Sequence, residues 1–349
     1  MTVGPLLVMG ALLAVGGACS AGATAAGDTR EVPEDGAGDA DTSDTIADPA
    51  DDAGTGDTTG GDGVQDDGAG DGTTIDGGDT VSDAGPDSGG GCPAGGAWPR
   101  RILLIGNSYT SVNHLGGALA TLLETHPCAG GTGVFADEYA PGGYRLPQEL
   151  ADANDPSNAL YGKLRDPAGW DVVVMQDQSQ IPGFNDGDPL EVASLEALPG
   201  LVSLAHDAGA AVVLLMTWGH RDGDTNNPGL YPDYATMQAR LAAGYATYAA
   251  YATTATGVPI SVAPAGLAWQ AVHDDDFAPP VASEVAAARF AGLYAPDGSH
   301  PSPRGTYLAA ATLLVTLTGQ SPAAATGAPG VDQADKAWLD EAAERATRL

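Results

Sequence analysis

A serine that follows a short apolar run has a spacing suited to covalent chemistry. The run Arg101–Ile105 ends at Gly106, and Ser108 comes two residues later, before a segment with helical leucine spacing. A buried strand is expected here, so the Ser108 hydroxyl would lie at the rim of a sheet. Its own N–H, near a helix start, could stabilise a negatively charged oxygen. The competing interpretation is that Ser108 only caps the helix, a common role of serine.

A second chemical group lies near the C-terminus, in the run Asp297-Gly298-Ser299-His300-Pro301. An aspartate three residues before a histidine can hold one ring nitrogen and leave the other free to take a serine proton. Of the six histidines, only His300 combines such a carboxylate with a Pro-Ser-Pro segment after it. His220 is the rival base. Metal binding is the rival function, although two ligands without a third make a poor site.

Apolar runs and helical spacings alternate along residues 92–349 and predict where these groups lie. Strands are expected at Arg101–Ile105, Val134–Ala140, Trp170–Met175, Ala211–Met216 and Pro259–Val262. Helices are expected from Leu115 to Leu123, Leu190 to His206, Tyr234 to Thr254, Arg304 to Thr318 and, as an outer amphipathic helix, Val331 to Arg348. This alternation is typical of an α/β domain whose parallel sheet is covered on both faces. In such sheets, chemistry collects in the loops at the carboxyl ends of the strands.

Taken in order, these blocks resemble the SGNH/GDSL hydrolase family over about residues 101–322. The matching blocks are Ile105-Gly106-Asn107-Ser108-Tyr109-Thr110, Pro141-Gly142-Gly143 and Asp297-Gly298-Ser299-His300-Pro301-Ser302, with Asn107 where the family name has Asp. The resemblance implies a flavodoxin-like three-layer αβα fold with a five-stranded parallel sheet. It also implies a triad of Ser108 as nucleophile, His300 as general base and Asp297 as orienting carboxylate. The G-x-S-x-G elbow of the α/β-hydrolases is absent around Ser108.

The loop after the third strand departs from the common family pattern. It reads Gln176-Asp177-Gln178-Ser179 and is similar to the Gln-x-x-Ser variant of some carbohydrate-esterase branches. Glutamine carries an amide donor, so it can replace the asparagine that many members use. The resemblance then implies an oxyanion hole made of the N–H groups of Ser108 and Gly143 and the side chain of Gln176. Gln178 is the second choice for this donor.

Four residues of these loops are expected to contact substrate: Asn107, Gln178, Trp218 and Arg221. Trp218 and Arg221 follow the fourth strand. Trp218 would offer a flat surface to a sugar ring, and Arg221 would meet an acidic substituent. The alternative for Trp218 is a buried ring in a structural turn. Trp269 is expected in the core, and the run Asp274–Asp276 on the solvated surface.

The N-terminal residues have the composition of an export signal. Residues 1–19 carry no charged side chain, and their apolar run is too short to span a bilayer comfortably. Small residues lead into Cys19, which resembles a lipoprotein processing site and implies acylation of Cys19. The n-region lacks Lys and Arg. Plain secretion and an uncleaved apolar N-terminus are the alternatives.

Residues 20–91 have the composition of a disordered linker. They hold 19 acidic residues, one basic residue and 18 glycines, with no aromatic side chain. So little apolar surface does not offset the entropy of ordering. Calcium binding is the rival, but the aspartates do not follow the register of a calcium loop. The full chain has a net charge of −33, which argues against nucleic acid as a partner.

Residues 92–349 form the expected hydrolase domain. An exported chain meets oxidising conditions, so the two cysteines of this domain, Cys92 and Cys128, are expected either to form a disulfide or to remain free thiols. The expected protein is an exported serine esterase acting on small acyl esters, acetyl esters of carbohydrate above all. Its substrate would be a small-molecule or glycan ester. It would contact a membrane only through a lipid anchor at its N-terminus. No cofactor or metal is needed. The alternatives are an acyltransferase with the same triad and a non-catalytic carbohydrate-binding module.

Overall fold

The computed structural model describes residues 92, 98–275, 277 and 279–348, and the predictions for residues 1–19, Cys19 and the linker lie outside them. The described chain contains a five-stranded parallel sheet with the order β2-β1-β3-β4-β5. The strands are β1 (Arg101–Ile105), β2 (Phe135–Tyr139), β3 (Val172–Met175), β4 (Ala211–Leu215) and β5 (Ile260–Ala263). The α/β fold and the five expected strands are confirmed, with shifts of one to two residues at their ends.

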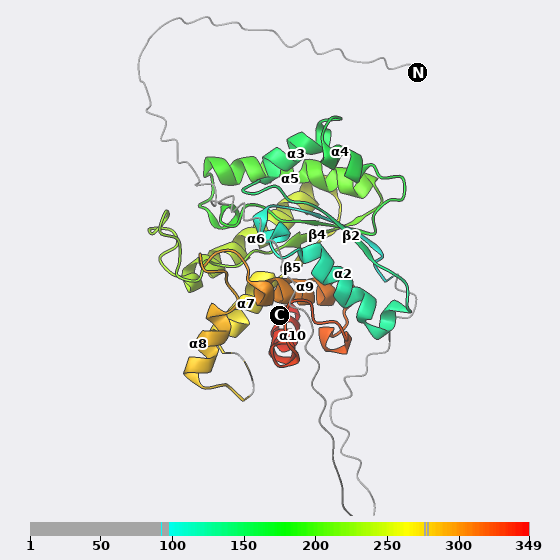
Figure 1. Ribbon diagram of the computed structural model, residues 1–349. Helices are drawn as coiled ribbons and strands as arrows, with labels where there is room; N and C mark the ends of the chain where they lie inside the picture. Colours follow the sequence, from blue (N-terminus) through cyan, green and yellow to red (C-terminus); the bar gives the residue numbers. More distant parts are fainter. Residues whose placement is uncertain (1–91, 93–97, 276, 278, 349) are drawn as a thin grey trace, which may run out of the picture. The chain divides into compact units, whose positions relative to one another are not determined.

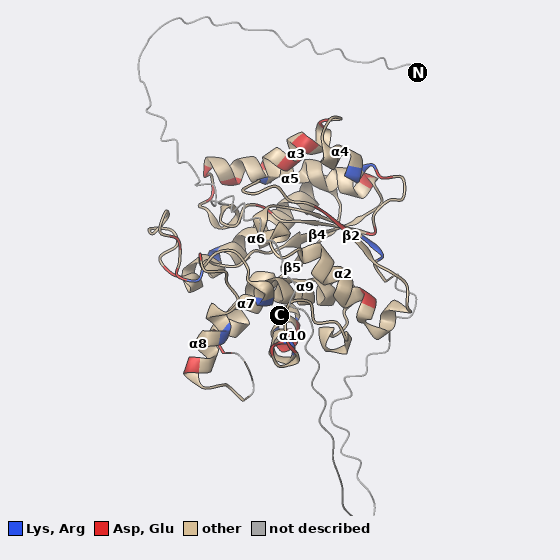
Figure 2. Cartoon of the chain, in the orientation of Figure 1, with Lys and Arg blue, Asp and Glu red and all other residues tan. Residues whose placement is uncertain are grey.

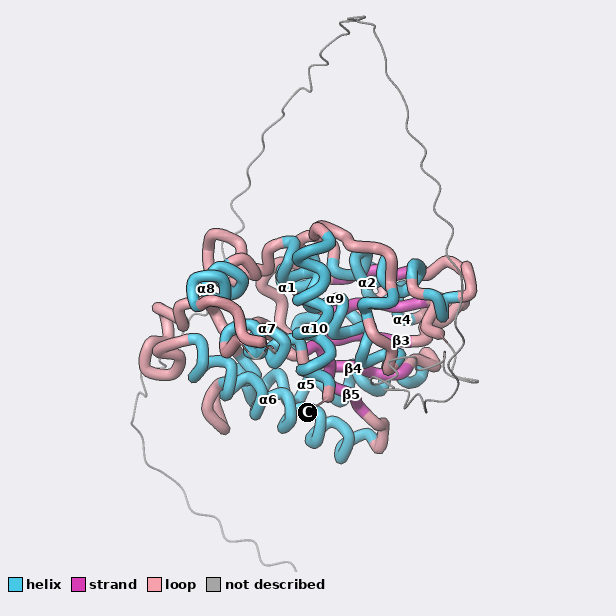
Figure 3. Tube along the Cα trace, turned by 90° about the horizontal axis from the view of Figure 1, so that it is seen from below, coloured by secondary structure: helices cyan, strands magenta, loops and turns pink. Residues whose placement is uncertain are grey.

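Helices cover both faces of the sheet (Figure 1). Successive side chains of a strand point to opposite faces, so Leu103 and Ile105 join one core while Ile102 and Leu104 join another. The first core lies under α3 (Leu146–Asn154), α4 (Ala159–Leu164), α5 (Pro189–Asp207) and α6 (Tyr234–Thr256). The second lies under α2 (Leu115–Thr125), α7 (Ala265–His273), α9 (Pro303–Thr318) and α10 (Gln333–Thr347), the helices nearest the viewer in Figure 3.

The expected long helices are present, but four shorter ones were missed. These are α3, α4, α7 and α8 (Ser283–Ala291), each of six to nine residues. Such segments show at most two or three turns of apolar spacing, which is too little to separate helix from loop. The C-terminal helix packs against α7 and α9, as its amphipathic pattern indicates. Trp269 on α7 is fully buried, as expected.

One glycine fixes how the segment after β3 meets α6. Gly244 lies inside the long helix α6, and a Cβ atom there would lie 1.5 Å from the carbonyl oxygen of Pro182. Pro182 belongs to a short 3₁₀ turn, η2 (Ile181–Gly183), that follows the predicted oxyanion loop. Glycine is unfavourable in a helix interior, so its presence here reflects this backbone approach. The segment after β3 therefore packs directly against α6.

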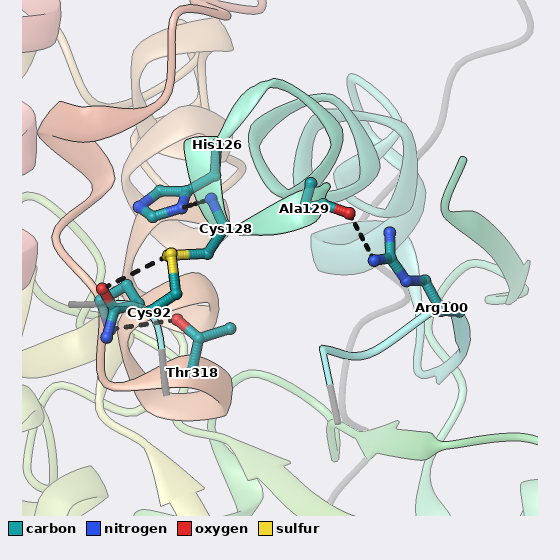
Figure 4. The surroundings of a disulfide bond; sticks show 7 residues. Cys92, Arg100, His126, Cys128, Ala129 and Thr318 are labelled. Atoms are coloured by element: carbon teal, nitrogen blue, oxygen red, sulfur yellow. Dashed lines mark hydrogen bonds between the residues drawn. A yellow bond between two sulfur atoms is a disulfide. The ribbon is translucent and has the colours of Figure 1, made fainter. Parts of the chain in front are cut away.

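A disulfide joins Cys92 to Cys128, with 5.3 Å between their Cα atoms (Figure 4). Cys128 lies in a second 3₁₀ turn, η1 (Pro127–Ala129), just after α2, and its N–H donates to His126 Nδ1 over 3.1 Å. The bond closes a loop with a sequence separation of 36 residues. In the chain-entropy account such a loop closure stabilises the fold by about 4 kcal/mol.

Positions of Lys and Arg are interspersed with positions of Asp and Glu along the chain, as the blue and red segments of the cartoon in Figure 2 show. Within the described ranges, most basic side chains are paired with acidic ones, as Arg101 with Asp166 and Lys163 with Asp137. No helix in this part of the chain combines the length and apolar character that crossing a membrane requires.

Candidate active site

The nucleophile candidate lies at the first turn after β1. Ser108 begins the short helix α1 (Ser108–Ser111), and Asn107 caps it by accepting a hydrogen bond from the N–H of Tyr109 over 3.1 Å. Ser108 is therefore not the cap, and its hydroxyl is free for another partner. Because β1 is the second strand of the sheet, this turn lies beside the ends of β2 and β3.

The three predicted triad residues lie within hydrogen-bond distance of one another. His300 Nε2 is 2.9 Å from Ser108 Oγ, and His300 Nδ1 is 2.7 Å from Asp297 Oδ2. The first contact joins residues 192 positions apart. The His300 side chain is 15% exposed and the Asp297 side chain 49%. The order serine, imidazole and carboxylate is the arrangement in which a histidine takes a serine proton while the carboxylate fixes its tautomer.

A tight turn aims Asp297 at His300. Asp297 Oδ1 accepts hydrogen bonds from the backbone N–H groups of Ser299 and His300, while its other oxygen meets the ring. Gly298 makes the turn with a φ of +74°. Partial burial acts to raise the pKa of Asp297, but the hydrogen bonds from Ser299 and His300 lower it below its ordinary value. The aspartate is thus held as a carboxylate.

Trp218 supports the site from the core, which contradicts its prediction as a sugar platform. Its ring is fully buried and stacks on Trp269 with 4.0 Å between ring centroids and on Tyr109 with 5.0 Å. Its Nε1 donates to the carbonyl oxygen of Ser299, within the Asp297–His300 turn. Tyr109 in turn presents its edge to the His300 ring at 5.3 Å. This column of rings positions the histidine.

Asn107 is also wrong as a substrate contact. Its side chain is buried, and Nδ2 donates to the carbonyl oxygen of Tyr144 over 2.9 Å. Oδ1 accepts from the Tyr109 N–H and from Gln176 Nε2. Its side chain thus joins the nucleophile turn to the loops after β2 and β3.

The structure does not place Gln176 as an oxyanion donor. Its Nε2 donates to Asn107 Oδ1 over 3.0 Å and to the carbonyl oxygen of Asp177, which uses both of its N–H bonds. Its Oε1 accepts from the Asn107 N–H and from Thr110 Oγ1. Gln176 holds the nucleophile turn from the neighbouring strand, and its amide has no donor left.

Several donors near these loops have no internal partner among the residues that the structure describes, and three of them suit an oxyanion hole. They are the backbone N–H groups of Ser108 and Gly143 and the Nε2 group of Gln178. Gly143 lies in the turn after β2 with a φ of +70°, a conformation that favours glycine. Gln178 Oε1 accepts from the Gln180 N–H over 2.9 Å, which fixes the amide while leaving its NH₂ uncommitted.

Arg221 lies beside the triad, whereas His220 is buried. The Arg221 N–H donates to the carbonyl oxygen of Gly298 over 2.8 Å, so the loop after β4 supports the Asp297 turn. The Arg221 guanidinium is partly exposed and pairs with Asp222 at 2.7 Å. The backbone N–H of His220 meets Met237 Sδ, and the contact to the Ser108 hydroxyl comes from His300 instead.

Sequence reasoning missed Tyr109, Tyr144 and Asp177 as parts of the site. Tyr109 and Asp177 stand beside motif residues, but a buried tyrosine or aspartate gives no sequence signal of its own. Only their contacts with distant segments reveal their role. The described residues contain no group of three or more His, Cys, Asp or Glu side chains arranged to hold a metal ion.

Comparisons with known proteins agree with this architecture. No protein-family profile and no curated protein matches the chain. Among solved structures, a DUF4886 family protein from Bacteroides uniformis is 19% identical with a TM-score of 0.54, over 72% of this chain and 95% of that chain. A candidate SGNH hydrolase from Slackia heliotrinireducens is 29% identical with a TM-score of 0.46, over 62% and 98%. A GDSL-like lipase from Bacteroides thetaiotaomicron is 18% identical with a TM-score of 0.35, over 63% and 89%.

The likeness to the Bacteroides uniformis protein shows a shared fold. The other two matches carry the names of SGNH and GDSL hydrolases, the family that the sequence blocks resemble. The chain has an α/β fold with a five-stranded parallel sheet, and its sequence blocks resemble those of the SGNH/GDSL hydrolases.

Proposed function

We propose that the chain is an exported serine esterase that hydrolyses small acyl esters through Ser108, His300 and Asp297. The observation that carries this proposal is the continuous contact from Ser108 Oγ to His300 Nε2 at 2.9 Å and from His300 Nδ1 to Asp297 Oδ2 at 2.7 Å. Three side chains from two ends of the domain meet in the order that nucleophilic catalysis requires. The similarity to SGNH and GDSL hydrolases supports the same class of reaction.

The reaction follows from this order of groups. Ser108 Oγ attacks the ester carbonyl carbon as its proton passes to His300 Nε2, and the protonated imidazole then gives that proton to the leaving alcohol. An acyl-enzyme on Ser108 remains. Water attacks it with His300 again as the base, which releases the acid and restores the serine. Asp297 keeps its negative charge throughout and stabilises the imidazolium.

The negatively charged oxygen of each tetrahedral intermediate needs donors, and we assign them to the N–H groups of Ser108 and Gly143 and to the side chain of Gln178. These three groups have no partner within the described residues, whereas the Gln176 amide is fully used. Donors fixed before the reaction stabilise the developing charge without reorganisation. Gln178 therefore takes the role that the sequence first suggested for Gln176.

Replacing Gln178 by alanine tests this assignment. We expect Gln178→Ala to lower kcat by about 10²–10³ with little change in KM, since one oxyanion donor is typically worth that much. The measurement is the hydrolysis of a chromogenic acetate ester. Gln180→Ala is the neighbouring control, because the Gln180 side chain binds Asn227 and supports the next loop. Equal losses in the two variants would assign Gln178 a structural role only.

We extend the proposal to carbohydrate acetyl esters, with the sequence resemblance as its support. The burial of Trp218 removes the flat ring once expected to bind a sugar. Arg221 remains at the edge of the site, partly exposed and next to the Asp297 turn, and it is the residue we assign to a polar or acidic group of the substrate. Export and a lipid anchor at Cys19 are part of the same proposal and rest on the N-terminal sequence.

Covalent labelling tests the proposed function directly. A fluorophosphonate reacts with an activated serine by forming a phosphorus–oxygen bond and releasing fluoride. We expect one label per chain, mapped by peptide mass spectrometry to the peptide that contains Ser108. Heat-unfolded protein is the control, because the same serine loses its base on unfolding. Label on another serine, or none on the folded protein, would contradict the proposal.

A further inference from the structure

A buried carboxylate joins the two loops that carry the assigned oxyanion donors. Asp177 is 1% exposed, and its Oδ1 accepts from the N–H of Gln178 over 2.8 Å and from the N–H of Leu146 over 3.2 Å. Gln178 lies in the loop after β3, while Leu146 begins α3 three residues after Gly143. One oxygen atom therefore holds the Gly143 loop and the Gln178 loop together.

The second oxygen of Asp177 reaches a third element. Asp177 Oδ2 accepts from the hydroxyl of Tyr248 on α6 over 3.1 Å. Burial raises the pKa of Asp177 above its ordinary value, and the hydrogen bonds from Ser194, Gln178, Leu146 and Tyr248 act against this rise. Each of these donors binds the charged form more strongly than the neutral form.

A second buried carboxyl group lies near the first. Glu149 on α3 is fully buried, and neither of its side-chain oxygens has a hydrogen-bond partner among the described residues. Burial, together with the charge of Asp177, raises the pKa of Glu149 well above its ordinary value. Two such groups do not both ionise in the interior. Three donors point to the Asp177 oxygens and none to those of Glu149, which favours the negative charge on Asp177 and the proton on Glu149.

We propose that Asp177 is a positioning residue for the oxyanion hole and that Glu149 supports it by remaining neutral in the interior. Asp177 acts through the backbone N–H of Gln178 and through the first residue of α3, and it does not contact the substrate. This inference rests on the proposed function, because it concerns the same oxyanion hole. This role accounts for the burial of the Asp177 side chain next to oxyanion donors that carry no charge.

The first test replaces the charge while keeping the shape. Asp177→Asn turns charge-assisted hydrogen bonds into neutral ones, and we expect kcat for a chromogenic acetate ester to fall about 10-fold to 100-fold, less than for a deleted donor. KM should change little, because ground-state binding does not use these donors. Rates are divided by the concentration of active sites, which is measured by titration with a fluorophosphonate. Unfolded protein then does not lower the measured kcat. Asp155→Asn is the control: it removes a charge at the end of α3, but the Asp155 side chain binds Ser157 and not the oxyanion loops.

The second test removes the ionisable carboxyl group of Glu149 while keeping the shape of the side chain. Glu149→Gln keeps the shape and the neutral state, so kcat should stay within about twofold of the parent at pH 6. A raised pKa means that the native state keeps a proton that the unfolded chain releases. The parent's free energy of unfolding therefore falls as pH rises above the ordinary glutamate value, and Glu149→Gln should lose this fall. Asp177 and Asp152 are the charged groups that act on Glu149, so the Asp152→Asn variant is measured in parallel.

The outcomes separate this inference from the proposed function. A parent protein without esterase activity overturns the proposed function and this inference with it. An active parent whose Asp177→Asn variant keeps its kcat within twofold overturns the positioning role alone. If Asp177→Asn does not fold, Tyr248→Phe, which removes one donor to Asp177, should still lower kcat severalfold at constant KM, and an unchanged kcat would count against Asp177. A Glu149→Gln variant as impaired at pH 6 as Asp177→Asn overturns the neutral role.

Discussion

Ser108→Ala is expected to lower kcat for a small acyl ester by about 10⁴–10⁶ while leaving the fold intact. The substitution removes the atom that would form the acyl-enzyme, and the remaining donors and base can only assist a water molecule. Among the described residues, the Ser108 hydroxyl bonds one side chain, His300, whose ring is partly exposed, so its loss leaves no fully buried group without a partner. Alanine is also well suited to the first turn of a helix. The free energy of unfolding should therefore change by less than about 1 kcal/mol.

The measurement is steady-state hydrolysis together with thermal unfolding of the same preparations. Ser111→Ala is the matched control, since Ser111 ends the same short helix and its described contacts use only its backbone. It should retain the activity of the parent. If the Ser108→Ala variant hydrolyses the ester at the parent rate, then Ser108 is not the nucleophile.

Asp297→Asn is expected to lower kcat by about 10³–10⁴ through the wrong histidine tautomer. The backbone N–H groups of Ser299 and His300 bind Asp297 Oδ1, and the oxygen of an asparagine can keep both of these bonds. Its NH₂ group then faces His300 Nδ1, where the carboxylate oxygen stood. An imidazole that accepts at Nδ1 carries its proton on Nε2, so it cannot take the proton of Ser108.

A second aspartate–histidine pair supplies the control for this variant. Asp274 Oδ1 lies 2.6 Å from His273 Nδ1, in a partly exposed pair outside the triad. Asp274→Asn should leave kcat unchanged. The parent keeps Asp297 ionised between pH 7 and 9 because the pKa of Asp297 is lowered, whereas an asparagine has no carboxyl to titrate, so raising the pH should not rescue Asp297→Asn. Recovery of activity between pH 7 and 9 would argue that orientation by Asp297 is not needed.

The sequence was most informative where the signal is local. Strands β1, β3 and β4 each contain a run of four or five apolar residues, and the Asp297–His300 turn lies within four residues. The family-like blocks then connect Ser108 with a histidine 192 residues away. Strands, fold class and the three residues that meet at the site could therefore be predicted without any knowledge of tertiary contacts.

The roles of the supporting residues could not be predicted, because long-range partners decide them. Gln176 and Asn107 looked like substrate-facing amides, yet they bind each other across 69 residues of sequence. Trp218 looked like an exposed platform, but rings from two other segments enclose it. A polar or aromatic side chain at a strand end can face the substrate or the interior, and only packing distinguishes the two.

The disulfide also determines where a pulling force would enter the domain. A pull transmitted along the residues that precede Cys92 would pass through the two sulfur atoms to Cys128, which follows α2. Strand β1, which ends three residues before the nucleophile, would then be spared most of the tension. If the protein is held at a surface by its N-terminus, the disulfide would carry a pulling force away from β1. The position of Ser108 would then not change under that force.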